Sequence, residues 1–314
     1  MKGFSIGEAV GEAFGLLARR PLSMFGWGVL MLLPGVFVAA AMLSVMGSGA
    51  WTAEPKPDMA AFWQLQIASQ LSNLVQIVLA VLVTTAIYRA VFAGKKRSAF
   101  LGFGMQELQV AVAWILIFVV MFAIMVAAIL LGGGLVAGIW SQGVAARWTA
   151  GVGVGLVAFV LILIANARLS LLPPAAVRFG GFGLNDGWRL GRGQTARLFL
   201  LQLAIFLVAL ALGVAMILMF LIVALGLRAV LGAPTWSPSS DPQTWFRDVP
   251  SAVWLATAVV GLPLFAIVQS FSQALNVAPA ASALAQLADA EAARLARKAA
   301  LADPQPTESP LEGA

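Results

Sequence analysis

The side chains in this sequence that could do chemistry inside a membrane are few, and the most regular set consists of amides. Gln66, Gln70, Asn73 and Gln76 follow a spacing close to i, i+4, i+7 and i+10, which places them on one face of a helix. We call these four residues the amide row. Such a row can line a cleft for a small polar or amphiphilic solute, or it can hydrogen-bond to a neighbouring helix. Both interpretations stand at this stage.

Two arginines form a second candidate set. Arg89 and Arg168 each lie at the end of a long apolar stretch. A guanidinium can bind a phosphate through two parallel hydrogen bonds, so arginines at headgroup depth are candidate contacts for a lipid phosphate. An arginine in that position can also extend to the membrane surface as an anchor. The sequence leaves both roles open.

The remaining chemistry is narrow. The chain has no histidine and no cysteine, so it lacks an imidazole base, a thiol nucleophile and the usual ligands of zinc and haem. Glu8, Glu12, Glu107 and Asp186 lie outside the apolar stretches, on segments that we expect to be solvated surface helices. The absence of carboxylates from the apolar stretches disfavours proton-coupled transport. We therefore expect no enzymatic activity, no metal and no cofactor.

The composition indicates that membrane-spanning helices carry these residues. Of 314 residues, 61% are hydrophobic and 10% are charged, whereas a soluble domain carries about 25% charged residues. A membrane-spanning helix needs about 20 mostly apolar residues. The stretches that qualify are 22–46, 67–92, 110–131, 151–167, 198–227 and 252–275. The sequence predicts an all-α, polytopic integral membrane bundle with six transmembrane helices.

The basic residues predict the orientation of that bundle. With six spans, most of the 19 basic residues fall on the side that holds both termini, and the exceptions are Lys56, Arg147, Arg228 and Arg247. Since positive flanks stay in the cytoplasm, we expect both termini to be cytoplasmic, in the plasma (inner) membrane of a bacterium. The net charge of +6 follows from this bias, so we do not expect nucleic-acid binding.

A short amphipathic helix is predicted on the cytoplasmic side before each of the three hairpins. In the first, Ser5 and Glu8 have the spacing of a capping box. The predicted apolar face holds Ile6, Val10, Phe14 and Leu17, and glycines recur at Gly3, Gly7, Gly11 and Gly15. Glycine destabilises a helix interior by about 1 kcal/mol relative to alanine, so this spacing indicates close approach to another backbone.

The other two predicted surface helices resemble the first in part. Before the fifth span, Gly183, Gly187 and Gly191 repeat the glycine spacing. Before the third span, the amphipathic pattern remains in Phe100, Leu101, Phe103 and Leu108, without the glycines. The alternative is that any two-span hairpin with positive flanks has this appearance.

Several further features bear on the spans and on the domain boundaries. The glycine run at 132–134 is a candidate break in the third span, and Pro263 should kink the sixth. We expect a six-span domain over 1–279, a cytoplasmic helical tail over 280–302 and disorder over 303–314, where prolines are frequent.

One region resembles a known family. The motifs are ARLSLLPPAAV at 167–177 and WRLGRGQTARLFLLQ at 188–202, and the matching residues are Arg168, Ser170, Pro173, Trp188, Arg192 and Phe199. They resemble a broad, mostly uncharacterised bacterial family of six-span proteins related to the membrane domain of glycerophosphoryl diester phosphodiesterases. The catalytic domain of those enzymes has no counterpart in this chain. The resemblance implies a membrane context near phospholipids.

These observations favour a non-enzymatic membrane protein that binds membrane phospholipid or acts as a scaffold for other membrane proteins. The alternative is a transporter or facilitator of a small polar or amphiphilic solute, with the amide row as its cleft. Oligomeric state is left open.

The predicted orientation can be tested with reporter fusions. Fusions at Gly49, Gln142 and Ser239 should be active only as periplasmic reporters, because these sites follow odd-numbered spans. Fusions at Lys96 and Gly181 should be active only as cytoplasmic reporters. A reversed pattern at any two of the five sites would contradict the predicted orientation.

Overall fold

The computed structural model describes residues 3–47, 59–93, 101–231 and 251–302. Within these ranges the chain is helical and contains no strand. The long helices are α2 (Pro21–Gly47), α3 (Met59–Ala93), α4 (Met105–Gly138), α5 (Val144–Leu169), α8 (Thr195–Leu231) and α10 (Ser251–Ala302). Each contains one of the six predicted stretches, and the described residues form six helices long and apolar enough to cross a membrane. The chain is an all-α, multi-pass membrane protein.

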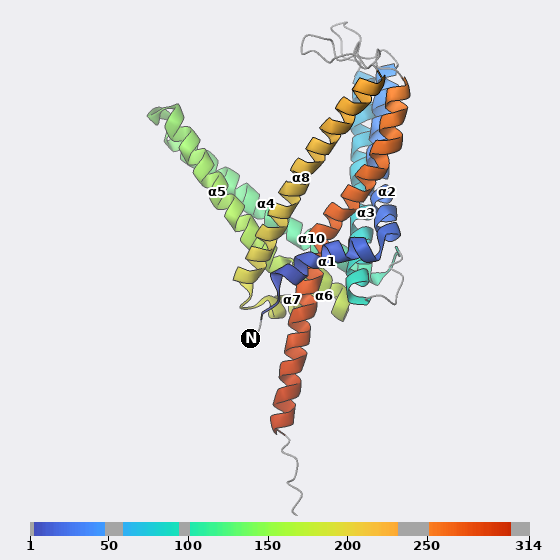
Figure 1. Cartoon of the computed structure of the whole chain (residues 1–314). Helices are drawn as coiled ribbons and strands as arrows, with labels where there is room; N and C mark the ends of the chain where they lie inside the picture. Colours follow the sequence, from blue (N-terminus) through green and yellow to red (C-terminus); the bar gives the residue numbers. More distant parts are fainter. Residues whose placement is uncertain (1–2, 48–58, 94–100, 232–250, 303–314) are drawn as a thin grey trace, which may run out of the picture.

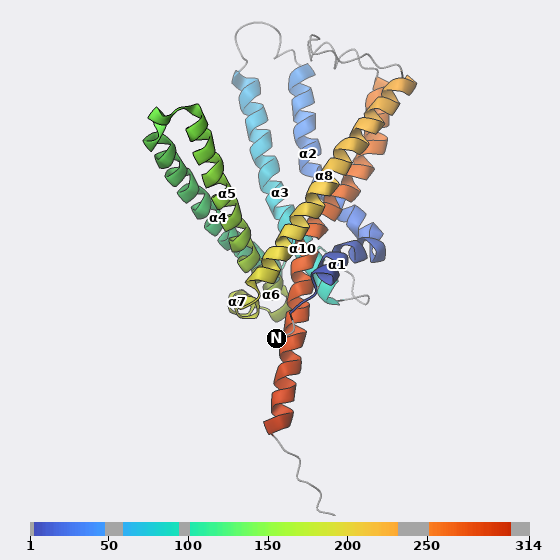
Figure 2. The ribbon, with the colours of Figure 1, turned by 60° about the vertical axis from the view of Figure 1, so that its left-hand side comes forward.

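The long helices form three antiparallel hairpins, α2–α3, α4–α5 and α8–α10. Helix α10 packs against α2, α3 and α8, whereas α4 packs mainly against its own partner α5, and α5 also contacts α8. Figures 1 and 2 show the α4–α5 hairpin (green) leaning away from the other long helices. Large apolar side chains on this hairpin are exposed, including Phe118, Ile129, Leu130 and Leu131. Such surfaces suit contact with lipid tails.

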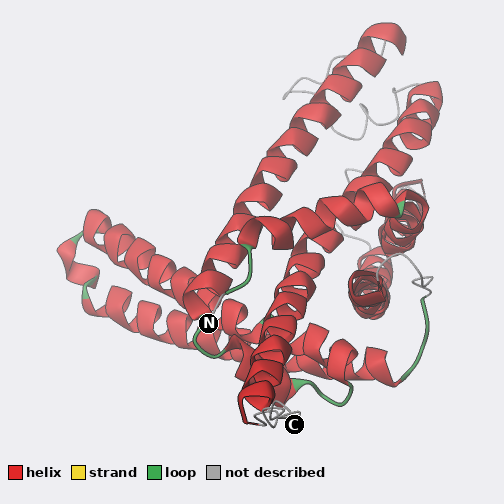
Figure 3. Ribbon diagram, turned by 60° about the horizontal axis from the view of Figure 1, so that its bottom comes forward, coloured by secondary structure: helices red, strands yellow, loops and turns green. Residues whose placement is uncertain are grey.

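Short helices gather where the long helices converge (Figure 1). They are α1 (Ile6–Arg19), α6 (Leu172–Phe179) and α7 (Leu184–Gly191). All three contact α10, which continues past them as a single helix. We call α1, α6, α7 and residues 280–302 of α10 the basal layer. Figure 3 turns this end toward the viewer. The short 3-10 helix η1 (Trp140–Gln142) joins α4 to α5 at the opposite end.

Helix α1 begins as predicted, but its most deeply buried residues are not the predicted ones. The Glu8 backbone N–H donates to Ser5 Oγ at 3.3 Å, so Ser5 is the N-cap. The residues of α1 that are fully buried are Ala9, Ala13 and Leu16. Phe14, which was predicted on the apolar face, is half-exposed, and its ring lies 5.0 Å from that of Phe271. Small side chains therefore make the closest contacts of this helix.

The two glycine series differ in their surroundings. A Cβ added at Gly7 or Gly11 would meet nothing within 4 Å. The prediction of close backbone approach is wrong for these positions, because Ala9 and Ala13 face the protein instead. In α7, by contrast, a Cβ on Gly183 would lie 2.2 Å from the backbone N of Ala176, and one on Gly187 would lie 2.9 Å from the carbonyl oxygen of Leu171. Gly183 also has φ of +62°, which favours glycine. Close approach is confirmed at these two positions.

Other expectations about element boundaries need correction. Residues 101–104 are not helical, and α4 begins directly at Met105, so no separate surface helix precedes α4 within the described residues. Phe100 lies outside them. The glycine run at 132–134 does not break the third span, because α4 continues to Gly138. The apolar sequence on both sides of the run supports an uninterrupted helix there.

One helix runs through the predicted boundary at 279. Helix α10 has 52 residues and includes both Pro263 and Pro279, so at 1.5 Å per residue it is about 78 Å long. The last span and the predicted helical tail are thus one element. Buried Ala278, Ala281 and Leu284 anchor the helix on both sides of Pro279. This packing explains why the proline does not end the helix. The predicted disorder of 303–314 lies outside the described residues.

Close packing between α2 and α10 can be tested at Gly28. A Cβ added there would lie 1.8 Å from the carbonyl oxygen of Ala266, whereas one added at Gly26 would meet nothing within 4 Å. Gly28→Ala should therefore force the two helices apart and destabilise the protein by about 1–3 kcal/mol. Thermal unfolding in detergent measures the effect, with Gly26→Ala as the control on the same helix. Equal unfolding temperatures for the two variants would contradict the packing.

Candidate functional site: the charged basal layer

An ion pair connects the first two hairpins at their basal end. Arg89 lies near the end of α3, and Gln106 and Glu107 lie in the first turn of α4. Arg89 Nη2 donates to Glu107 Oε1 at 2.5 Å, and Arg89 Nε donates to Gln106 Oε1 at 2.9 Å. Two edges of the guanidinium are thus bound to neighbouring residues of α4. These contacts favour a structural role for Arg89, and its contact with a lipid phosphate stays a prediction.

Glu107 is not the solvated residue expected from the sequence. Its side chain is only 7% exposed. The segment before α4 lies across it, since a Cβ added at Gly104 would be 3.3 Å from Glu107 Oε2. The first turn of a helix also stabilises a carboxylate through the helix dipole. The expectation was wrong because Glu107 was placed on a surface helix that the described residues do not contain. The glycines at 102 and 104 were the available signal that this segment passes close to the Glu107 carboxylate.

Glu107 depends strongly on Arg89. Glu107 Oε2 is buried, and no hydrogen-bond partner for it is found among the described residues; the same holds for Gln109 Oε1. A buried carboxylate that loses its cation is strongly destabilising. The ion pair therefore links α3 to α4, and loss of Arg89 would leave the buried carboxylate without its cation.

Arg168 occupies a different environment from Arg89. It lies in the last turn of α5, and its guanidinium carbon is 5.2 Å from the centre of the Trp188 ring in α7. This distance suits a cation–π contact. The structure therefore does not bring the two candidate arginines together, and one contacts an acid while the other contacts an aromatic ring. Binding of a lipid phosphate by Arg168 stays a prediction.

The amide row lies on α3, with little contact to the rest of the protein. Gln66, Gln70 and Asn73 are exposed, and Gln76 is partly buried, with Nε2 3.9 Å from Met31 Sδ. In this part of α3, Ser72 hydrogen-bonds to α2, and its Oγ donates to the Pro34 carbonyl at 2.8 Å. Neither of the two hollows described below is lined by a member of the row. The interpretation as a cleft gains no support from them.

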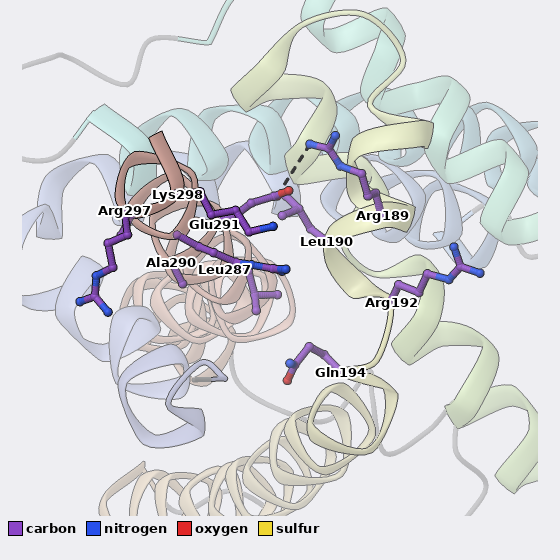
Figure 4. A pocket seen from close by; sticks show the side chains of 11 residues that line it. Arg189, Leu190, Arg192, Gln194, Leu287, Ala290, Glu291, Arg297 and Lys298 are labelled. Carbon is purple, nitrogen blue, oxygen red and sulfur yellow. Dashed lines mark ion pairs between the residues drawn. The ribbon is translucent and has the colours of Figure 1, made fainter. Parts of the chain in front are cut away.

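The larger hollow lies in the basal layer, between α7, the start of α8 and the end of α10. It has a volume of about 620 Å³, and we call it the basal pocket. Figure 4 shows its residues from close by. Most of its polar lining is cationic, and the complete lining is Arg189, Leu190, Arg192, Gln194, Leu287, Ala290, Glu291, Ala293, Arg294, Arg297 and Lys298. A smaller, apolar hollow of about 240 Å³ lies between α2 and α10 beside Pro263.

The charges of the basal pocket are unbalanced. Glu291 is its one acidic lining residue, and it pairs with Arg189 across the pocket at 3.7 Å (Figure 4). Arg189 also lies 3.8 Å from Asp186. The other four cations of the lining form no ion pair within the described part of the chain. Sequence reasoning counted these cations as membrane flanks and did not predict that they surround one hollow.

Polar contacts from two other elements hold the end of α10 in place. The Ser5 backbone N–H, just before α1, donates to Gln286 Oε1 at 2.7 Å. Arg178 of α6 pairs with Asp289 at 2.7 Å. The wall of the basal pocket that α10 supplies is therefore attached to α1 and α6 as well as to α7.

No family model, curated protein or solved structure matches this chain. The resemblance to the membrane domain of glycerophosphoryl diester phosphodiesterases therefore stays an expectation from the motifs. Function has to be argued from the residues themselves.

The ion pair between α3 and α4 can be tested by removing Arg89 alone and then both partners together. Arg89→Gln leaves the Glu107 carboxylate buried without its cation and should lower stability by about 3–5 kcal/mol. Arg89→Gln combined with Glu107→Gln removes both charges and should cost clearly less. Unfolding in detergent gives both values. As a control, Arg19→Gln removes the more exposed ion pair with Glu12 and should cost at most about 1 kcal/mol. A double variant no more stable than Arg89→Gln alone would contradict the pairing.

Proposed function

We propose that this protein is a non-enzymatic component of the bacterial inner membrane that associates with anionic phospholipids through its basal layer. The observation that carries the proposal is the crowding of cations at one end of an apolar bundle. Near the basal end lie Arg19, Arg20, Arg89, Arg168, Arg178, Arg189, Arg192, Arg197, Arg294, Arg297 and Lys298, whereas Arg147 and Arg228 belong to helix ends on the opposite side. Each cation near an anionic membrane surface contributes about 1 kcal/mol of attraction.

The surroundings of these cations support a lipid ligand. Exposed apolar side chains continue directly from the charged end along the long helices. A phospholipid combines the same two properties, because its charged phosphate lies next to its apolar tails. Gln194 and the apolar residues of the basal pocket add contacts for the neutral part of a headgroup.

A scaffold role is a second candidate, and one feature favours it. The end of α10 extends beyond the other helices of the basal layer (Figure 2), and the residues at 292–299 are exposed. An exposed helix of this kind offers a surface to a second membrane protein. The transport alternative requires a cavity lined by the amide row, and the described hollows lie elsewhere.

Lipid selectivity tests the proposal. The purified protein, incubated with equal amounts of phosphatidylglycerol and phosphatidylcholine, should retain more phosphatidylglycerol when bound lipids are counted by native mass spectrometry. The preference should weaken as salt increases, because salt screens surface charges. Neutralising three basal cations, with Arg19→Gln, Arg20→Gln and Arg197→Gln together, should reduce it.

Arg147→Gln is the matched control, since it removes a cation from the opposite end and should leave the preference unchanged. Equal retention of the two lipids by the unmodified protein would overturn the proposal.

A further inference from the structure

Three cations lie close together in sequence near the end of α10. Arg297 and Lys298 follow Arg294 by three and four residues, so the side chain of Arg294 lies near both. Like charges at this spacing repel, and no ion pair compensates them within the described residues. A bound anion would remove this repulsion.

A second element brings further cations to the same hollow. Arg189 and Arg192 come from the end of α7, and they line the basal pocket together with the three cations of α10. Buried Leu190 and Leu287 lie in the same lining and fix the two helices against each other. The Arg178–Asp289 pair holds α10 from the side of α6. The helices that carry these cations are thus held together before any ligand binds, which lowers the entropic cost of binding.

The size and the apolar part of the pocket limit the kind of anion. A volume of about 620 Å³ falls within the range of small-molecule sites and is larger than a bare phosphate needs. Leu190, Leu287, Ala290 and Ala293 provide an apolar wall. Together they suit a phosphate that carries a small organic group, such as the headgroup region of a phospholipid or a soluble phosphate ester.

We propose that the basal pocket is a binding site for the phosphate group of such an ester, with Arg192, Arg294 and Lys298 as its cationic contacts. The assignment rests on the proposed function and deepens it, because it locates the recognition of phosphate in one pocket. Guanidinium groups suit this ligand, since each can donate two parallel hydrogen bonds to phosphate oxygens. Glu291 pairs with Arg189 at 3.7 Å and belongs to the same lining, so its negative charge opposes the binding of an anion there.

The negative charge of Glu291 provides a test in which binding should increase. Glu291→Gln removes the one carboxylate of the lining, so the variant protein should bind the phosphate ligand about fivefold more tightly than the unmodified protein. A variant that merely misfolds would not bind more tightly. Glu8→Gln is the matched control, because it makes the same charge change at an exposed position of α1, outside the pocket.

Removing cations should have the opposite effect. Arg192→Gln together with Arg294→Gln takes one cation from each side of the pocket and should weaken binding about tenfold or more. The full-length protein is used throughout, in two arms. Phosphatidylglycerol in nanodiscs probes the lipid source, and sn-glycerol 3-phosphate titrated calorimetrically into detergent-solubilised protein probes the soluble source.

The outcomes separate the inference from the proposed function. Tighter binding by Glu291→Gln and weaker binding by the double variant, in either arm, support the pocket, and the arm that responds identifies the source. If the unmodified protein still prefers phosphatidylglycerol but both pocket variants behave like Glu8→Gln, the pocket assignment is overturned and lipid association by the basal layer stands. If a short RNA binds the unmodified protein and neither phosphate ligand does, both are overturned.

Discussion

The close approach of neighbouring backbones to α10 is the constraint on which the other parts of the structure depend. Apolar side chains gain little by leaving lipid for a protein interior, so helices in a membrane associate through close packing between small residues. Helix α10 meets this requirement with buried Ala266, Ala274, Ala278, Ala281 and Ala283. The same helix then forms one wall of the basal pocket. Helix α10 therefore determines both the packing of the last span and the shape of the basal pocket.

The spans were predictable because their signal is local. Long apolar runs between charged flanks can satisfy their backbone hydrogen bonds only as helices in a membrane, and six such runs correspond to the six long helices. The continuity of α10 through Pro279 was not predictable in this way, since it depends on partners on both sides of the proline. Ala9 and Ala13, and not the glycines of α1, make the close contacts of this helix. This too depends on which side of α1 the rest of the protein occupies.

Much less of the candidate site followed from the sequence. The cations of the pocket were visible in the sequence as basic flanks, at 189 and 192 and again at 294, 297 and 298. The two groups are about a hundred residues apart in the chain, and only the fold brings them to one hollow. The amide row was the more regular pattern, yet three of its members are exposed on α3. Periodicity identifies the face of a helix, and it does not identify what lies opposite that face. Glu107 illustrates the same limit, because a non-helical segment at 101–104 lies over it in place of the expected surface helix.

The weak attachment of the α4–α5 hairpin has a consequence for cooperativity. Apart from α8, it is joined to the rest of the protein mainly at its base, through α6 and the Arg89–Glu107 pair. The most apolar part of α4 has no buried residues at all, so surrounding lipid provides nearly all of its solvation. Elements with few internal contacts open at a lower free energy than the core. Unfolding of this protein should accordingly proceed in more than one step, with the α4–α5 hairpin separating before the helices packed on α10 come apart.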